Sequence, residues 1–177
     1  MKLDRKSFKD FHKQLEAELK DSEEYYNRLY PLLGQIASNF ARLEWELNQS
    51  FALAVNDSDL EIGLSIADQL SFNQVIKLFQ TIAQRSTIER SKKFSSRLKS
   101  LTQDLEKSAK LRNDSLHCSF GYVLGSSGSF LKTRARIKSK EKHRGSPMID
   151  PFPDLVKADN HILKTISKLL KFTTDYI

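Results

Sequence analysis

The sequence has few of the residues that break, cross-link or anchor a chain. Its 177 residues include six glycines, four prolines and one cysteine, Cys118. A single cysteine excludes an internal disulfide and favours a reducing, cytoplasmic location. No apolar stretch approaches the roughly 18 residues that a membrane span requires. The charged opening MKLDRKSFKDFHKQ is not typical of a signal peptide. We therefore expect a cytoplasmic protein without a membrane partner.

Several kinds of catalytic and metal site are also missing. The four histidines form no metal-binding pair and the lone cysteine adds no second thiol, so no metal is expected. The glycines of GYVLGSSG precede no predicted helix, which indicates a turn and not a phosphate-binding loop. Cys118 directly follows His117, and adjacent helix residues point about 100° apart, so a Cys–His nucleophile pair is not expected. We expect no cofactor.

Apolar residues recur at helical spacing along most of the chain, which predicts one all-α domain over residues 1–177. We expect an N-terminal helix over 1–30, core helices within 31–118 and a C-terminal helix over 150–177. Pro31 is expected in the first turn of a new helix. The predicted inward-facing residues, helix by helix, are Phe8, Phe11, Leu15 and Leu19; Ile36, Phe40, Leu43, Leu47 and Phe51; Ile66, Leu70, Val75, Leu78 and Ile82; Phe94, Leu98, Leu101 and Leu105; and Leu155, Ile162, Ile166, Leu169 and Leu170.

The periodicity changes after Gly121. Tyr122-Val123-Leu124, the turn GSSG and the alternating segment SFLKTRARIK predict a β-hairpin over residues 120–140. The cations of its second arm alternate onto one face and are Lys132, Arg134, Arg136 and Lys138. The predicted architecture is therefore a bundle of about five helices with a hairpin inserted before the last helix.

Positive charge is concentrated in the second half of the chain. Between Arg85 and Arg144 there are 16 Lys and Arg residues against 5 Asp and Glu, a local net charge of +11 within a chain of +7. Such asymmetry is typical of proteins that contact phosphates, most often those of nucleic acid. A solvated charged surface has the same pattern, so the hairpin cations are equally compatible with RNA contact and with simple solvation.

The stretch LRNDSLHCSFG places three polar residues at the end of the fourth predicted helix. Arg112 lies seven residues after Leu105, so it continues the stripe that faces the bundle. Asn113 and His117 are four residues apart and share one helix face, where the amide could bond the imidazole. The flexible arginine side chain could bend toward the same ring, so the three side chains could converge on one small ligand.

These residues match the R-N-x-x-x-H motif of the HEPN superfamily, which the chain resembles over most of its length. The resemblance rests on a helix of the FARLEWEL type, two further helices ending in the motif, a hairpin and a closing helix. It implies a dimeric, metal-independent ribonuclease that occurs in toxin–antitoxin pairs or antiviral defence, with an antitoxin or other defence partner. Ser119 stands where some toxin members carry a tyrosine, so no role for that tyrosine transfers.

The chemistry of RNA cleavage suits the residue types of the motif. Without a metal, the 2′-hydroxyl attacks the adjacent phosphate and leaves a 2′,3′-cyclic phosphate, which requires proton transfer and a fixed positive charge. His117 is the expected acid or base. Arg112 would hold the phosphate oxygens, and Asn113 would orient the imidazole or bond the phosphate. Glu44 is expected to support Arg112.

A purely structural role explains the same residues. Arg112 would then pair with Glu44 or Glu46, and His117 would be a helix-terminal residue favoured by the helix dipole. The corresponding alternative function is a non-catalytic helical module that dimerises and binds protein or nucleic acid. RNA cleavage in the presence of a chelator separates the two hypotheses.

Overall fold

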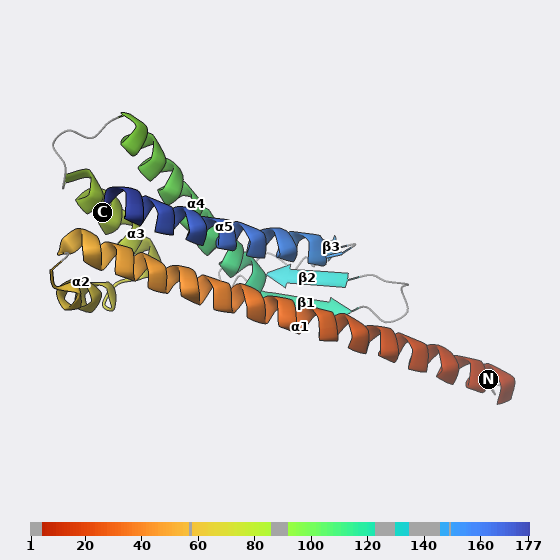
Figure 1. Ribbon diagram of the computed structural model, residues 1–177. Coiled ribbons are helices and arrows are strands. Elements are labelled where there is room, and N and C mark those ends of the chain that lie inside the picture. The colour runs from red at the N-terminus through yellow and green to blue at the C-terminus, as the bar shows by residue number, and fades with distance from the viewer. Residues whose placement is uncertain (1–4, 57, 86–91, 123–129, 135–145, 149) are drawn as a thin grey trace, which may run out of the picture.

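The chain is a bundle of five helices with a small sheet at one end (Figure 1). The computed structural model describes residues 5–56, 58–85, 92–122, 130–134, 146–148 and 150–177. The elements in chain order are α1 (Arg5–Val55), α2 (Leu60–Ala67), α3 (Phe72–Arg85), α4 (Lys92–Leu116), β1 (Cys118–Tyr122), β2 (Phe130–Arg134), β3 (Ser146–Met148) and α5 (Phe152–Tyr176). The predicted all-α helical bundle is confirmed.

Helix α1 runs unbroken through Pro31, so the predicted boundary at residue 30 is wrong. Proline removes one backbone hydrogen bond and costs about 3 kcal/mol inside a helix. The cost is offset because apolar residues are buried on both sides of it. Leu29 is 1% exposed and Ile36 is fully buried on the same stripe, and burying one such side chain contributes about 1.5–3 kcal/mol. The two predicted helices therefore form the single helix α1, because apolar side chains are buried on both sides of Pro31.

The N-terminal part of α1 projects beyond the other helices (Figure 1). Tyr25 packs edge-on against Phe152, with ring centroids 5.6 Å apart, where α5 begins. The roughly twenty residues before Tyr25 extend about 30 Å along the helix axis without α5 beside them. Leu19 is 54% exposed in this projection, so its predicted inward position is wrong.

The predicted third helix is two helices. Asp59 caps α2 by accepting a hydrogen bond from the Glu61 backbone N–H at 3.0 Å. The Ser71 N–H donates to the Gln74 side chain at 2.9 Å, half of a capping box that starts α3. This break rotates the second helix, so that Phe79 is buried while Leu78 is 38% exposed. Ile66 is also exposed, at 40%, and both predicted inward positions are wrong.

The core lies among α1, α3, α4 and α5, with α2 contributing Ala67. The predicted stripes from Ile36 to Phe51 and from Phe94 to Leu105 are buried, as is most of the stripe on α5. Leu170 is 39% exposed and is the one predicted α5 position that is wrong. Pairs of hydroxyls join the helices at 2.7 Å and 3.2 Å, namely Ser50 with Thr173 and Ser108 with Thr165. These contacts fix the axial register of α5 against its neighbours.

Three short strands follow α4. Strand β1 pairs antiparallel with β2, with Cys118 opposite Arg134 and Tyr122 opposite Phe130, and β2 pairs antiparallel with β3. The turn of the predicted hairpin over 120–140 and the end of its second arm lie outside the described residues, so the hairpin as a unit stays a prediction. Strand β3 was not predicted.

Candidate functional site

The predicted motif occupies the last two turns of α4, where the chain leaves the bundle. The His117 N–H donates to the Asn113 carbonyl at 3.1 Å, which extends the helical turn by one residue. The Ser115 hydroxyl and the Cys118 thiol donate to the carbonyls of Leu111 and Asp114, each at 2.8 Å. Side-chain donors thus satisfy carbonyls of the final turns. The end of α4 is a fixed position for the side chains it carries.

Arg112 lies over the edge of the core, as its place in the stripe predicts. Its guanidinium carbon is 5.3 Å from the ring centroid of Phe40 on α1, a cation–π distance. Its Nη1 donates to the Asn113 side-chain oxygen at 3.0 Å. The half-buried arginine is therefore held by an aromatic face and an amide. Its remaining N–H groups supply further donors for an anion.

Neither acid expected beside Arg112 pairs with it among the described residues. Glu46 lies 3.8 Å from Arg42 on its own helix. Glu44 is one turn of α1 beyond Phe40, the residue that Arg112 covers. No hydrogen bond or ion pair joins Glu44 to Arg112 among the described residues, and the supporting role of Glu44 stays a prediction. Helical spacing predicted the direction of Arg112 correctly but could not predict which turn of α1 lies opposite.

Asn113 and His117 are both exposed. The Asn113 oxygen accepts its hydrogen bond from Arg112, and among the described residues no side-chain bond joins the amide to the imidazole. The structure thus brings Arg112 and Asn113 together and leaves the imidazole open to solvent. The expected orientation of His117 by Asn113 is not seen. A ligand at this helix end would meet both an imidazole and a guanidinium.

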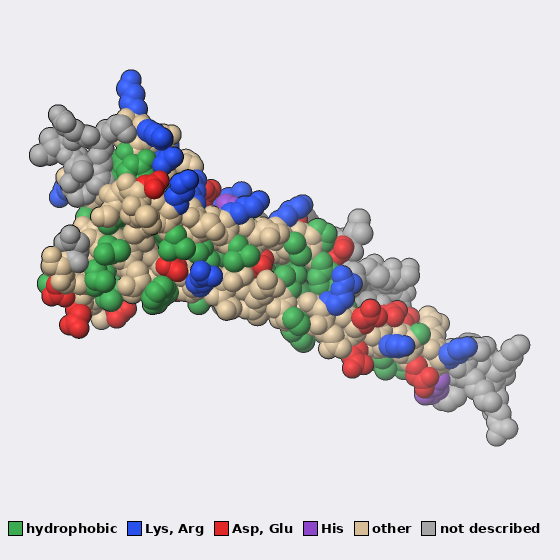
Figure 2. All heavy atoms as spheres, in the orientation of Figure 1, with side chains coloured by type: hydrophobic (Ala, Val, Ile, Leu, Met, Phe, Trp, Pro, Cys, Tyr) green, Lys and Arg blue, Asp and Glu red, His purple; other side chains and the backbone are tan. Residues whose placement is uncertain are grey.

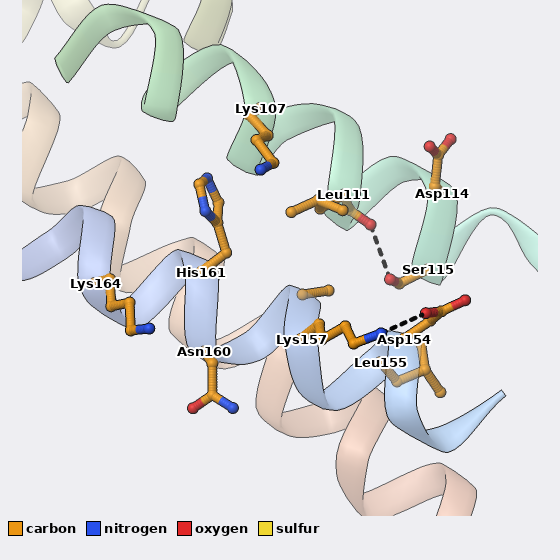
Figure 3. A pocket seen from close by; sticks show the side chains of 11 residues that line it. Lys107, Leu111, Asp114, Ser115, Asp154, Leu155, Lys157, Asn160, His161 and Lys164 are labelled. Atoms are coloured by element: carbon orange, nitrogen blue, oxygen red, sulfur yellow. Dashed lines mark hydrogen bonds and ion pairs between the residues drawn. The ribbon is translucent and has the colours of Figure 1, made fainter. Parts of the chain in front are cut away.

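A groove between α4 and α5 was not predicted from the sequence (Figure 3). It has a volume of about 860 Å³ and is lined by Lys107, Leu111, Asp114, Ser115, Asp154, Leu155, Lys157, Ala158, Asn160, His161 and Lys164. Its floor is apolar, because Leu155 and Ala158 are each only 2% exposed. Its rim carries three lysines from two helices. The seven-residue spacing of Lys157 and Lys164 was the available sequence signal, since it places both on one face of a helix.

His161 links the two walls of the groove. Its Nε2 lies 3.3 Å from the backbone carbonyl of Asp104 on α4, and a carbonyl only accepts, so this nitrogen carries the proton. Figure 3 shows Lys107 and His161 projecting toward each other from the two helices, while Asp114 points away from α5. Lys157 lies 3.6 Å from Asp154 in an exposed pair. The His161 N–H is thus used within the protein, and the exposed Lys107 and Lys164 offer the charged donors of the groove.

Charge is segregated over the molecular surface. On the face drawn in Figure 2, blue Lys and Arg side chains line the edge formed by α4 and α5, whereas red acidic side chains gather along the N-terminal part of α1 and at the end near α2. Helix α4 carries seven Lys and Arg residues against three acids. Residues 12–24 of α1 carry five acids against two lysines. The cationic surface lies next to the motif and the groove.

The hairpin cations cannot be assessed in the same way. Lys132 and Arg134 belong to β2, where the backbone of Lys132 pairs with Phe120 and Ser146. Arg136 and Lys138 lie outside the described residues. Contact of these four residues with RNA stays a prediction.

No protein-family model, curated protein or solved structure matches the chain. Within the part that the structure describes, no helix is long and apolar enough to cross a membrane. The same residues contain no cluster of three or more His, Cys, Asp or Glu side chains placed to hold a metal ion.

Proposed function

We propose that this protein is a metal-independent endoribonuclease that cleaves RNA at the C-terminal end of α4. The observation that carries the proposal is the arrangement of Arg112, Asn113 and His117. An arginine held by two contacts and an open imidazole share one helix end, on the cationic side of the molecule. The HEPN-like motif supports the same activity, as an effector of a toxin–antitoxin pair or of antiviral defence with a neutralising partner.

The reaction needs a base, an acid and a charge that the phosphate can contact. The RNA 2′-oxygen attacks phosphorus, the bond from phosphorus to the 5′-oxygen breaks, and a cyclic phosphate forms. The proton of the 2′-hydroxyl passes to one imidazole, and the departing 5′-oxygen receives a proton. Arg112 stabilises the phosphate oxygens as negative charge builds. Asn113 acts by fixing the guanidinium, which differs from its expected role on the imidazole.

One motif supplies a single histidine, so a homodimer that brings two copies of His117 together would provide both the base and the acid. Dimerisation is part of the proposal. It also agrees with the exposure of both Asn113 and His117, which leaves this helix end accessible to a second chain.

A non-catalytic nucleic-acid-binding module is the second candidate. It is favoured by one observation, the absence of a side chain that orients the imidazole of His117 among the described residues. Catalytic histidines are usually held by a second group. Both candidate functions use the cationic surface. Only the ribonuclease requires His117 for its activity.

The test compares cleavage of single-stranded RNA, with EDTA present, by wild type, Arg112→Ala and His117→Ala. Loss of a catalytic acid or base lowers the rate by about 10²–10⁴-fold, and loss of a charge-stabilising donor by about 10²–10³-fold. Exposed Arg42 and His12 provide matched controls, and their alanine variants should keep wild-type rates. Arg112→Lys keeps a cation over Phe40 but loses the planar fork, so it should fold and remain impaired. Equal rates for His117→Ala and wild type would contradict a catalytic role.

A further inference from the structure

We propose that the groove between α4 and α5 binds single-stranded RNA and delivers the strand to His117. This inference rests on the proposed function and names the part of the molecule that holds the substrate. The ligand is the phosphodiester backbone of one strand, with a base lying on the apolar floor. No contact specific to one base is required.

The groove has the size and chemistry for this ligand. Its volume of about 860 Å³ lies in the range of roughly 300–1,000 Å³ that is common for ligand sites. Leu111 is half-buried at the floor and offers an apolar surface to a base. Lys107 and Lys164 are exposed, and among the described residues no carboxylate forms an ion pair with either one. Their charges are therefore open to phosphates.

Two other cations between the same helices, Arg97 and Lys168, form ion pairs. Lys168 donates to Asp104 at 2.6 Å and Arg97 to Asp175 at 3.1 Å. These pairs lie farther along α5, away from the motif. Lys107 and Lys164, in contrast, lie near the end of α4 that carries the motif and form no ion pair with any described residue.

One face of α4 connects the groove to the motif. Lys107, Lys110, Asp114 and His117 follow one another at spacings of three, four and three residues, so they form one stripe along the helix. The final turn preserves this geometry through the His117 N–H bond to Asn113. Lys107 and His117 are ten residues apart, about 15 Å along the axis. A strand of a few nucleotides can contact both.

Two acidic side chains limit where the phosphates lie. Asp154 engages Lys157 at the end of the groove near the start of α5, and the Asp114 carboxylate points away from α5 (Figure 3). The phosphates therefore lie nearest to Lys107 and Lys164. The strand then leaves over Lys110 toward the helix end.

Binding is measured separately from cleavage with a fluorescein-labelled, fully 2′-O-methylated RNA, which has no 2′-hydroxyl to react. Fluorescence anisotropy gives its affinity for wild type and for a variant with Lys107, Lys157 and Lys164 changed to Ala. We expect about tenfold weaker binding near 0.1 M salt. The slope of log affinity against log salt should fall by about 1.4, since Lys107 and Lys164 each make one phosphate contact worth about 0.7 on a single strand. Lys157, in contrast, is paired with Asp154.

The matched control changes exposed Lys13, Lys20 and Lys77 to Ala. It removes the same charge from α1 and α3 and should bind within about twofold of wild type. Thermal unfolding confirms that both variants are folded. Equal losses in the two triple variants, or no loss in the groove variant, would overturn the groove as the RNA site.

The same proteins distinguish this inference from the proposed function. If wild type binds the methylated strand through the groove but leaves RNA with free 2′-hydroxyls intact, the ribonuclease proposal is refuted. The groove is then still supported as the RNA-binding site. If wild type cleaves RNA, and the groove variant binds and cleaves as the control does, the groove is not the RNA-binding site. The ribonuclease proposal is then retained.

Discussion

Tyr25 is the residue whose environment most changes its chemistry. It is 4% exposed and packs among Tyr26 and Phe152 where α5 begins. Burial raises its pKa from 10.0 to about 12, and the neighbouring charges of Tyr26, Asp150 and Tyr30 add to the shift. The neutral phenol is therefore favoured in the folded state.

This shift predicts a loss of stability in alkaline solution. Below pH 10 both states hold the proton and the contribution of Tyr25 is fully present. Between pH 10 and 12 the unfolded chain releases the proton while the folded chain retains it, so stability falls. Two pKa units correspond to about 2.7 kcal/mol. Urea unfolding at pH 9 and pH 11.5 should show the free energy of unfolding falling about 2 kcal/mol more in wild type than in Tyr25→Phe. Parallel decreases in the two proteins would contradict the assigned environment.

Arg112 shows what residue spacing can and cannot predict. Its direction toward the bundle follows from the stripe that ends at Leu105. The residue that contacts Arg112 cannot be predicted from the spacing, because Phe40 and Glu44 are one turn apart on α1. Only the packed structure shows that Phe40 is the one. Asn113 was predicted to bond the His117 imidazole, whereas its side-chain oxygen accepts a hydrogen bond from Arg112.

At the scale of the elements, α2 is positioned by a close approach to α1. A Cβ added at Gly63 would lie 2.4 Å from the Ala52 Cα, which is backbone and cannot move aside alone. Gly34, in contrast, has no atom near its added Cβ within 4 Å. The two glycines therefore have opposite tolerances for the same substitution.

Gly63→Ala should destabilise the protein by about 1–3 kcal/mol, because overpacking forces α2 away from α1. Gly34→Ala should stabilise it by about 0.5–1 kcal/mol, because alanine restricts the unfolded chain at an exposed helix position. Urea unfolding of both variants and wild type measures these changes. A neutral Gly63→Ala variant would show that the two helices do not meet here.

The two errors in predicting the elements have different causes. Pro31 was judged from a local preference that packing overrode, whereas the segment before Phe72 was judged from apolar spacing that overlooked a local cap. Burial of Leu29 and Ile36 carries α1 through its proline. The Ser71–Gln74 cap starts a new helix inside a continuous apolar pattern. By contrast, the stripes on α4 and most of α5 were predicted correctly, because regular spacing over several turns specifies a buried face.

At the scale of the whole molecule, the groove could not be predicted from the chain alone. Lys107 and Lys157 are separated by fifty residues and line the same groove only because α5 packs along α4. The sequence did predict that positive charge gathers in its second half. The stretch from Arg85 to Arg144 includes α4, and the face drawn in Figure 2 shows cations along α4 and α5, while contact of the hairpin cations with RNA stays a prediction.

The most direct measurement uses a DNA strand with one internal ribonucleotide, incubated with the wild-type protein and EDTA and analysed by mass spectrometry. The strand has a single 2′-hydroxyl, so attack by that group can break only one bond. Chemistry at Arg112 and His117 predicts one cut, with a 2′,3′-cyclic phosphate on one product and a 5′-hydroxyl on the other. An intact strand under conditions of saturated binding, or products ending in a 3′-hydroxyl and a 5′-phosphate, would contradict the proposed function.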